Sequence, residues 1–267
     1  MKVLLNLYKY YRWLSLDVAV GAISVLYLLQ ASFEVSVNTA TYIALGSAIW
    51  LVYLLDHWLD ARQISVIAPR RIFYRKVRNK LLMLATIPVS MGLVSILFLP
   101  KPILMSGMGL VVICLVYLKF NEALAAMYLK ELCVAIVFAA ACSLPIWMKE
   151  GFSTPVLVSV SMLTLLAFVN LLVFAFYESE EDKREDFDSI ALLLSPKCHE
   201  ILVWVLLVLI VGLSFFLEVE WRFSAFIIFS SSMLGLVMIL RNFFNVGERY
   251  RMLGDGIFLM ALFFAWL

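Results

Sequence analysis

Histidine, cysteine and charge are all scarce in this sequence of 267 residues. It has two histidines and four cysteines, and no two cysteines form a C-x-x-C pair. Zinc and haem centres need such residues in close spacing, so the sequence argues against both. Only 15% of the residues are charged, well below the share typical of a soluble domain. The shortage of charge therefore argues against a soluble protein.

Apolar residues take the place of the missing charge. They make up 64% of the chain, and the mean hydropathy is +1.00. The short alternating segments of an outer-membrane barrel are absent, as are linkers rich in glycine, serine or proline and a cleavable signal peptide. We therefore predict one all-α membrane domain over residues 1–267. It has about nine spans, at residues 14–30, 37–55, 81–99, 103–118, 131–148, 154–177, 199–217, 221–240 and 254–267.

The positive charges predict the orientation of these spans. If the amino terminus lies in the cytoplasm, the outer segments contain only three of the 21 lysines and arginines, namely Lys101, Lys149 and Arg222. Cytoplasmic segments carry the excess of positive charge in membrane proteins. We therefore expect a cytoplasmic amino terminus and an external carboxyl terminus, in the inner membrane of a bacterium.

Two acidic pairs lie at predicted cytoplasmic ends of spans. Asp56 and Asp60 follow the second span, and Glu178 and Asp182 follow the sixth. Residues four apart share one face of a helix. Carboxylates at a helix carboxyl terminus are disfavoured by the helix dipole, and a bound cation would relieve this. Four carboxylates at the mouth of an apolar bundle can hold Mg²⁺ against a diphosphate, although a solvated helix end is the simpler interpretation of each pair.

A polar stripe leads into the predicted membrane from the second pair. Asn170, Phe174, Glu178 and Asp182 follow one another at four-residue steps. An asparagine two turns inside a membrane is costly unless it faces a polar cavity or a partner helix. We therefore take Asn170 as a candidate binding residue, with an interhelical hydrogen bond as the alternative.

Several cations lie close to these pairs. Lys119 and Lys130 flank a short inner connection next to Tyr117, while Lys183 and Arg184 directly follow the second pair. Contact with a negatively charged leaving group is the functional interpretation of these residues. Anchoring at the cytoplasmic membrane surface is the alternative.

The segment 69–80 is basic and contains aromatic residues. It suits a helix lying against anionic lipid, or a lid that brings cations over a diphosphate. Because its charge adjoins a membrane, we expect no nucleic-acid partner. We assign no role to Asp17, expected at headgroup level, or to His57, which points away from the Asp56–Asp60 face.

At these residues the chain resembles the UbiA family of intramembrane prenyltransferases. The family has nine transmembrane helices, with the motif N-D-x-x-D-x-x-x-D after the second helix and D-x-x-x-D after the sixth. Here Asp56 and Asp60 match the last two aspartates of the first motif, while Val52 and Tyr53 replace its leading Asn and Asp. The second motif reads Glu178 to Asp182. The stretch 130–145 also looks like the family.

The resemblance implies Mg²⁺-dependent transfer of a prenyl group from a prenyl diphosphate to a lipophilic, aromatic acceptor within the membrane. It implies that Mg²⁺ is held by four carboxylates, those of Asp56, Asp60, Glu178 and Asp182. Losing Asn and Asp from the first motif removes two oxygen donors from one of two expected metal sites.

Other functions stay open at this point. The same scaffold could cyclise the diphosphate without an acceptor, or could bind a lipid or quinone without catalysis. CDP-alcohol phosphotransferases share only the fragment Asp60-Ala61-Arg62 with this chain. A transporter would place ionisable groups and helix breaks near the bilayer midplane, whereas here the acids gather at one face.

Overall fold

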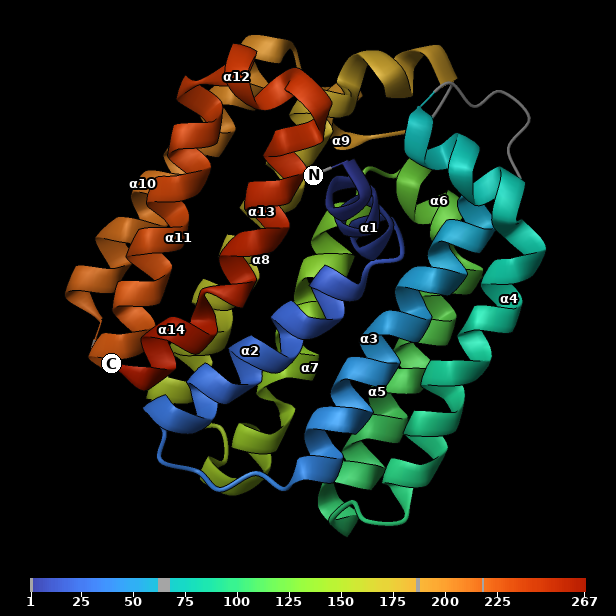
Figure 1. Cartoon of the computed structure of the whole chain (residues 1–267). Helices are drawn as coiled ribbons and strands as arrows, with labels where there is room; N and C mark the ends of the chain where they lie inside the picture. Colours follow the sequence, from blue (N-terminus) through green and yellow to red (C-terminus); the bar gives the residue numbers. More distant parts are fainter. Residues whose placement is uncertain (1, 62–67, 186–187, 218) are drawn as a thin grey trace.

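The computed structural model describes residues 2–61, 68–185, 188–217 and 219–267, and all regular structure in these ranges is helical (Figure 1). The longer helices are α1 (Lys2–Trp13), α2 (Leu16–Ser32), α3 (Thr39–Asp60), α4 (Pro69–Ile96), α5 (Lys101–Lys119), α7 (Lys130–Glu150), α8 (Thr154–Glu185), α10 (Pro196–Phe216), α11 (Trp221–Ile239) and α13 (Arg249–Leu259). The shorter ones are α6 (Asn121–Ala126), α9 (Ile190–Leu193), α12 (Arg241–Asn245), the 3₁₀ turn η1 (Val246–Glu248) and α14 (Ala261–Trp266).

The all-helical membrane fold predicted from the sequence is confirmed. Within the described ranges, seven helices are long and apolar enough to cross a membrane: α3, α4, α5, α7, α8, α10 and α11. Helix α2 is apolar too but has 17 residues, and the last predicted span is divided between α13 and α14. The count of nine spans and the cytoplasmic amino terminus stay predictions.

The long helices pack side by side along the bundle, some antiparallel and some parallel. Helix α2 packs on α3, α7, α13 and α14, while α8 packs on α7, α10 and α11. In Figure 1 the short helices α6, α9 and α12 lie at one end of the bundle, and the connection from α2 to α3 lies at the other. Short connections force consecutive helices into antiparallel hairpins, as for α2 with α3 and α7 with α8, whereas the other contacts join helices far apart in the sequence.

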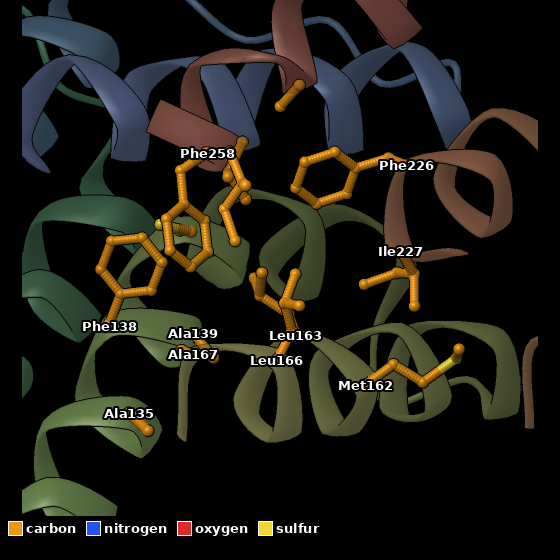
Figure 2. Close-up of a cluster of buried hydrophobic side chains, with 14 of the residues drawn as sticks. Ala135, Phe138, Ala139, Met162, Leu163, Leu166, Ala167, Phe226, Ile227 and Phe258 are labelled. Carbon is orange, nitrogen blue, oxygen red and sulfur yellow. The ribbon is translucent and has the colours of Figure 1, made fainter. Parts of the chain in front are cut away.

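The core lies where α2, α7, α8, α11 and α13 meet. Figure 2 shows Met162, Leu163 and Leu166 of α8 beneath Phe226 and Ile227 of α11. By contrast, α5 leaves most of its apolar side chains exposed, among them Met105, Met108, Val112, Ile113 and Leu115. Such a face suits lipid, because hydrocarbon chains are as apolar as the side chains they meet.

Two helices extend beyond their predicted spans. Helix α8 continues through the second acidic pair to Glu185, and α4 begins at Pro69, twelve residues before the predicted span at 81. The polar ends of both helices therefore stand on helical turns beyond the predicted spans, as the stripe from Asn170 to Asp182 and the lid-helix interpretation of segment 69–80 require. This difference positions the charged side chains described below.

Candidate active site

A cavity of about 220 Å³ opens among α2, α3, α4, α7, α8 and α13. All four residues of the predicted stripe on α8, Asn170, Phe174, Glu178 and Asp182, line it. Twelve residues of helix separate the first from the last, a rise of about 18 Å. The cavity thus runs along α8 from an intramembrane amide to the carboxylates at the helix end.

The inner part of the cavity is apolar. Its wall includes Ala135 and Phe138 of α7, Ala167 of α8 and Phe258 of α13. Figure 2 shows the rings of Phe138 and Phe258 next to each other; they are arranged edge to face, with their centroids 5.3 Å apart. The cavity therefore joins a charged mouth to an aromatic interior, which suits a ligand with an anionic head and an apolar tail.

Glu178 is held by a guanidinium fork. Arg251 of α13 donates from Nε to Oε1 and from Nη2 to Oε2, the second bond being 2.6 Å long. The hydroxyl of Tyr250 donates to Oε1 at 2.9 Å, and Nη2 of Arg70 lies 3.9 Å from Oε2. Both oxygens of Glu178 are thus engaged, in the two-bond geometry that makes Arg–carboxylate pairs strong.

The carboxylate of Glu178 also raises the pKa of the two side chains that contact it. Burial alone would lower the pKa of the Arg251 guanidinium, but Glu178 outweighs burial and holds that pKa well above its usual range. Burial and the same carboxylate raise the pKa of Tyr250. At neutral pH the site therefore contains a charged guanidinium and a protonated phenol.

Asp182 is engaged by a second arginine. Arg71 donates from Nη2 to Oδ1 of Asp182 at 2.7 Å and from Nη1 to Glu185. The backbone N–H of Ala68 donates to the other oxygen of Glu185 at 2.7 Å. These contacts tie the start of α4 to the end of α8. They are buried, since the side chain of Arg71 is 9% exposed and that of Asp182 is 5% exposed.

Asp56 lies on the α3 side of the cavity among weaker partners. Nδ2 of Asn121 donates to its Oδ1 at 3.2 Å, and the hydroxyl of Tyr117 donates to the same oxygen at 3.4 Å. The ammonium of Lys130 lies 3.6 Å from that oxygen. Asp56, Tyr117 and Lys130 all line the cavity, so the structure brings them together as the sequence predicted.

The remaining candidates have different positions. Asp60 ends α3, but its side chain lies outside the described part of the structure. Lys119, Lys183 and Arg184 are exposed and do not line the cavity. The ammonium of Lys119 lies 5.6 Å from the ring of Phe120. The binding roles predicted for these residues find no support in their positions.

Asn170 is 4% exposed, and its Oδ1 is buried without a hydrogen-bond partner. A Cβ placed on Gly254 of α13 would meet both this oxygen and the ring of Phe174. The amide oxygen therefore packs against the bare backbone of Gly254 and is an unused acceptor, while the residue itself lines the cavity.

Sequence reasoning missed several residues of the cavity wall. They are Arg12, Ser15, Asp17, His57, Arg70, Arg71, Arg251 and Asp255. The lid interpretation of segment 69–80 pointed to Arg70 and Arg71, but nothing in the sequence pointed to Arg251. His57 bonds Oγ of Ser15 at 2.8 Å and stacks on Tyr74 with ring centroids 4.2 Å apart.

The side chains as arranged do not fit a metal centre. Among the residues the structure describes, no group of three or more His, Cys, Asp and Glu side chains is placed to hold an ion. Both oxygens of Glu178 and one oxygen of Asp182 already accept hydrogen bonds from arginines. Breaking such buried pairs costs about 3–5 kcal/mol. The metal roles of Asp56, Asp60, Glu178 and Asp182 stay predictions.

The fold and cavity define a polytopic helical membrane protein with an amphipathic binding site. No protein-family model matches the sequence, and no curated protein matches it. Several solved structures have a similar fold, among them the following three. A digeranylgeranylglyceryl phosphate synthase is 16% identical with a TM-score of 0.57, and the match covers 96% of each chain.

The other two are structures of a UbiA homologue from Archaeoglobus fulgidus. The one bound to DMAPP and Mg²⁺ is 13% identical with a TM-score of 0.62, covering 96% of this chain and 98% of that one. The one bound to GPP and Mg²⁺ is 13% identical with a TM-score of 0.64, covering 97% and 98%. The chain therefore has the fold of the UbiA prenyltransferases, and the resemblance inferred from the motifs is confirmed in structure.

Proposed function

We propose that this chain is an intramembrane prenyltransferase. It binds a prenyl diphosphate with the diphosphate at the charged mouth of the cavity and the prenyl chain in the aromatic interior. It then transfers the prenyl group to a lipophilic, aromatic acceptor. The observation that carries the proposal is that Asp56 near the end of α3 and Glu178 and Asp182 near the end of α8 border one cavity, whose interior is lined by Phe138 and Phe258.

The proposed reaction follows from the side chains that line the cavity. The bond between the prenyl carbon and the diphosphate oxygen breaks, and its electron pair leaves with the diphosphate. Positive side chains at the mouth, Lys130, Arg70 and Arg251, stabilise that leaving charge. The aromatic faces of Phe174 and Tyr53 lie in the same wall and can stabilise the allylic cation.

Capture of the cation completes the reaction. The acceptor forms a bond to the prenyl carbon and releases a proton. The apolar wall keeps water from reaching the cation first. None of these reaction steps uses a metal ion, because the described carboxylates, as arranged, do not form a metal site. The Mg²⁺ dependence implied by the motifs stays a prediction, supported by the Mg²⁺ bound in the two structures of similar fold.

The test uses purified protein in nanodiscs, radiolabelled GPP and a panel of phenolic and quinol acceptors. We expect the label to enter an acceptor-derived lipid product. Asp56→Asn should lower turnover by about 100-fold or more, because Asp56 holds Lys130, whose ammonium lies 3.6 Å away and stabilises the leaving charge. Glu181→Gln, an exposed acid on α8 outside the cavity wall, is the matched control and should keep wild-type turnover.

The alternatives give other results. A product that forms without any acceptor would identify a cyclase. GPP that binds but is never consumed would identify a non-catalytic binding protein. Full turnover in Asp56→Asn would show that the reaction takes place elsewhere.

A further inference from the structure

The two arginines beside the second acidic motif retain donors that the protein does not use. Arg251 bonds Glu178 through Nε and Nη2, so its Nη1 has no hydrogen-bond partner in the described structure. Arg70 makes no hydrogen bond there and approaches Glu178 only at 3.9 Å. Both side chains line the cavity. Two guanidinium groups therefore face the mouth with donors available to an anion.

These guanidinium groups are held in place. The ring of Phe174 lies beneath Arg251, with the guanidinium carbon 4.6 Å from the ring centroid. Glu178 accepts hydrogen bonds from the guanidinium of Arg251 on the other side, and the hydroxyl of Tyr250 donates a hydrogen bond to Glu178. A guanidinium fixed between a carboxylate and a ring loses little side-chain entropy on binding a ligand. The arrangement is thus preorganised for an anion with several oxygens, such as a diphosphate.

The same contacts occupy most of the carboxylate oxygens of the second motif. A Mg²⁺ ion needs carboxylate oxygens with free lone pairs in octahedral geometry. Here Glu178 uses both oxygens on Arg251, and Asp182 uses one on Arg71. Replacement of the leading Asn and Asp of the first motif by Val52 and Tyr53 removes further oxygen donors.

We propose that Arg70 and Arg251 bind the diphosphate directly, in place of a metal bridge on the second acidic motif. Glu178 is then a positioning residue: it orients Arg251 and does not coordinate an ion. Arg71 has a structural role, since it joins α4 to α8 through Asp182 and Glu185. This inference rests on the proposed function, because it assigns a recognition mode to the same prenyl diphosphate.

The test measures GPP binding by calorimetry to the full-length protein in nanodiscs, once with MgCl₂ and once with EDTA. We expect the Kd of the wild-type protein to differ by less than about threefold between the two buffers. Arg251→Gln and Arg70→Gln should each weaken binding in EDTA by about tenfold or more, as expected for a lost charge-assisted contact. Arg251→Lys should recover only part of the loss, because an ammonium cannot replace the fork.

Two variants serve as matched controls. Arg249→Gln lies on the same helix outside the cavity wall, and Arg184→Gln removes an exposed charge beside the second motif. Both should bind GPP as the wild type does. Geraniol, which has the prenyl tail and no diphosphate, should bind Arg251→Gln and wild type equally. If Arg251→Gln weakened geraniol binding as much as GPP binding, the inference would be overturned.

Glu178→Gln separates positioning from metal binding. A positioning role predicts that this variant weakens GPP binding by the same factor in MgCl₂ and in EDTA. A metal ligand would instead show its loss only in MgCl₂. Loss of wild-type GPP binding in EDTA would also overturn the inference, yet leave the proposed function standing. Absence of GPP binding in both buffers would reject both.

Discussion

Two glycines on α13 flank Asp255 and differ in their surroundings. A Cβ on Gly254 would lie 2.5 Å from the ring of Phe174 and would also meet Asn170, whereas Gly256 has nothing within 4 Å. Gly254→Ala should therefore destabilise the protein by about 1–3 kcal/mol through overpacking. Gly256→Ala should stabilise it by up to about 1 kcal/mol, because alanine is the better helix former.

Thermal unfolding of both variants in detergent measures this difference. A melting temperature of Gly254→Ala at or above that of Gly256→Ala would show that α13 does not approach α8 as closely as described. Because Asn170 and Phe174 belong to the cavity wall, Gly254→Ala should also weaken GPP binding.

Individual residues of the site could be predicted only in part. Spacing at four-residue steps was enough to select Asn170, Glu178 and Asp182, because a helix places such residues on one face. The partners of these acids lie far away in sequence: 111 residues separate Arg71 from Asp182, and 73 separate Arg251 from Glu178. Local pattern contains no information on such pairs, so the arginines were missed.

At the scale of the helices, hydropathy predicted seven helices that are long and apolar enough to cross a membrane, and it misplaced some ends. The acid-rich run 178–188 was open to two interpretations, a solvated loop or the helical stripe to Asp182, and α8 continues to Glu185. Tertiary ion pairs with α4 and α13 stabilise that extension. The helix ends thus depend on contacts that no single segment reveals.

The first turns of α4 have two faces with different tasks. Arg71 and Tyr74 point inward, while Lys76 and Lys80 are exposed. We expect the exposed lysines to contact anionic lipid, at up to about 1 kcal/mol for each charge. Replacing both lysines by Gln should therefore reduce the gain in melting temperature that phosphatidylglycerol gives over neutral lipid.

Lys101→Gln, an exposed change at the start of α5, is the control and should keep the full gain. GPP binding should be unaffected by either change, since none of these lysines lines the cavity. An undiminished lipid effect in the double variant would assign this surface another role.

For the whole molecule, the distribution of charge predicts an odd number of crossings. With the amino terminus in the cytoplasm and nine spans, the carboxyl terminus lies outside. Expressed in a bacterium, a full-length fusion to alkaline phosphatase should be active, and the matching fusion to green fluorescent protein should be dark. A truncation fused after Tyr128 should give the reverse. Fluorescence of the full-length fusion would contradict the topology.

The bundle as a whole was predictable because a membrane requires helices of a fixed length, and nearly every apolar run has it. The cavity was not predictable to the same degree. Its shape depends on which faces of α2, α3, α7, α8 and α13 meet, and hydropathy does not rank the faces of helices that are apolar all round.

The central claim is that this cavity holds a prenyl diphosphate, and a ligand-bound experimental structure tests it most directly. Cryo-electron microscopy of the protein with a non-hydrolysable thio analogue of GPP would locate both ends of the ligand. The account predicts the diphosphate between Arg70, Arg251 and Lys130, with the prenyl chain extending toward Phe138 and Phe258. Ligand density outside this cavity, or a chain directed away from these rings, would contradict it.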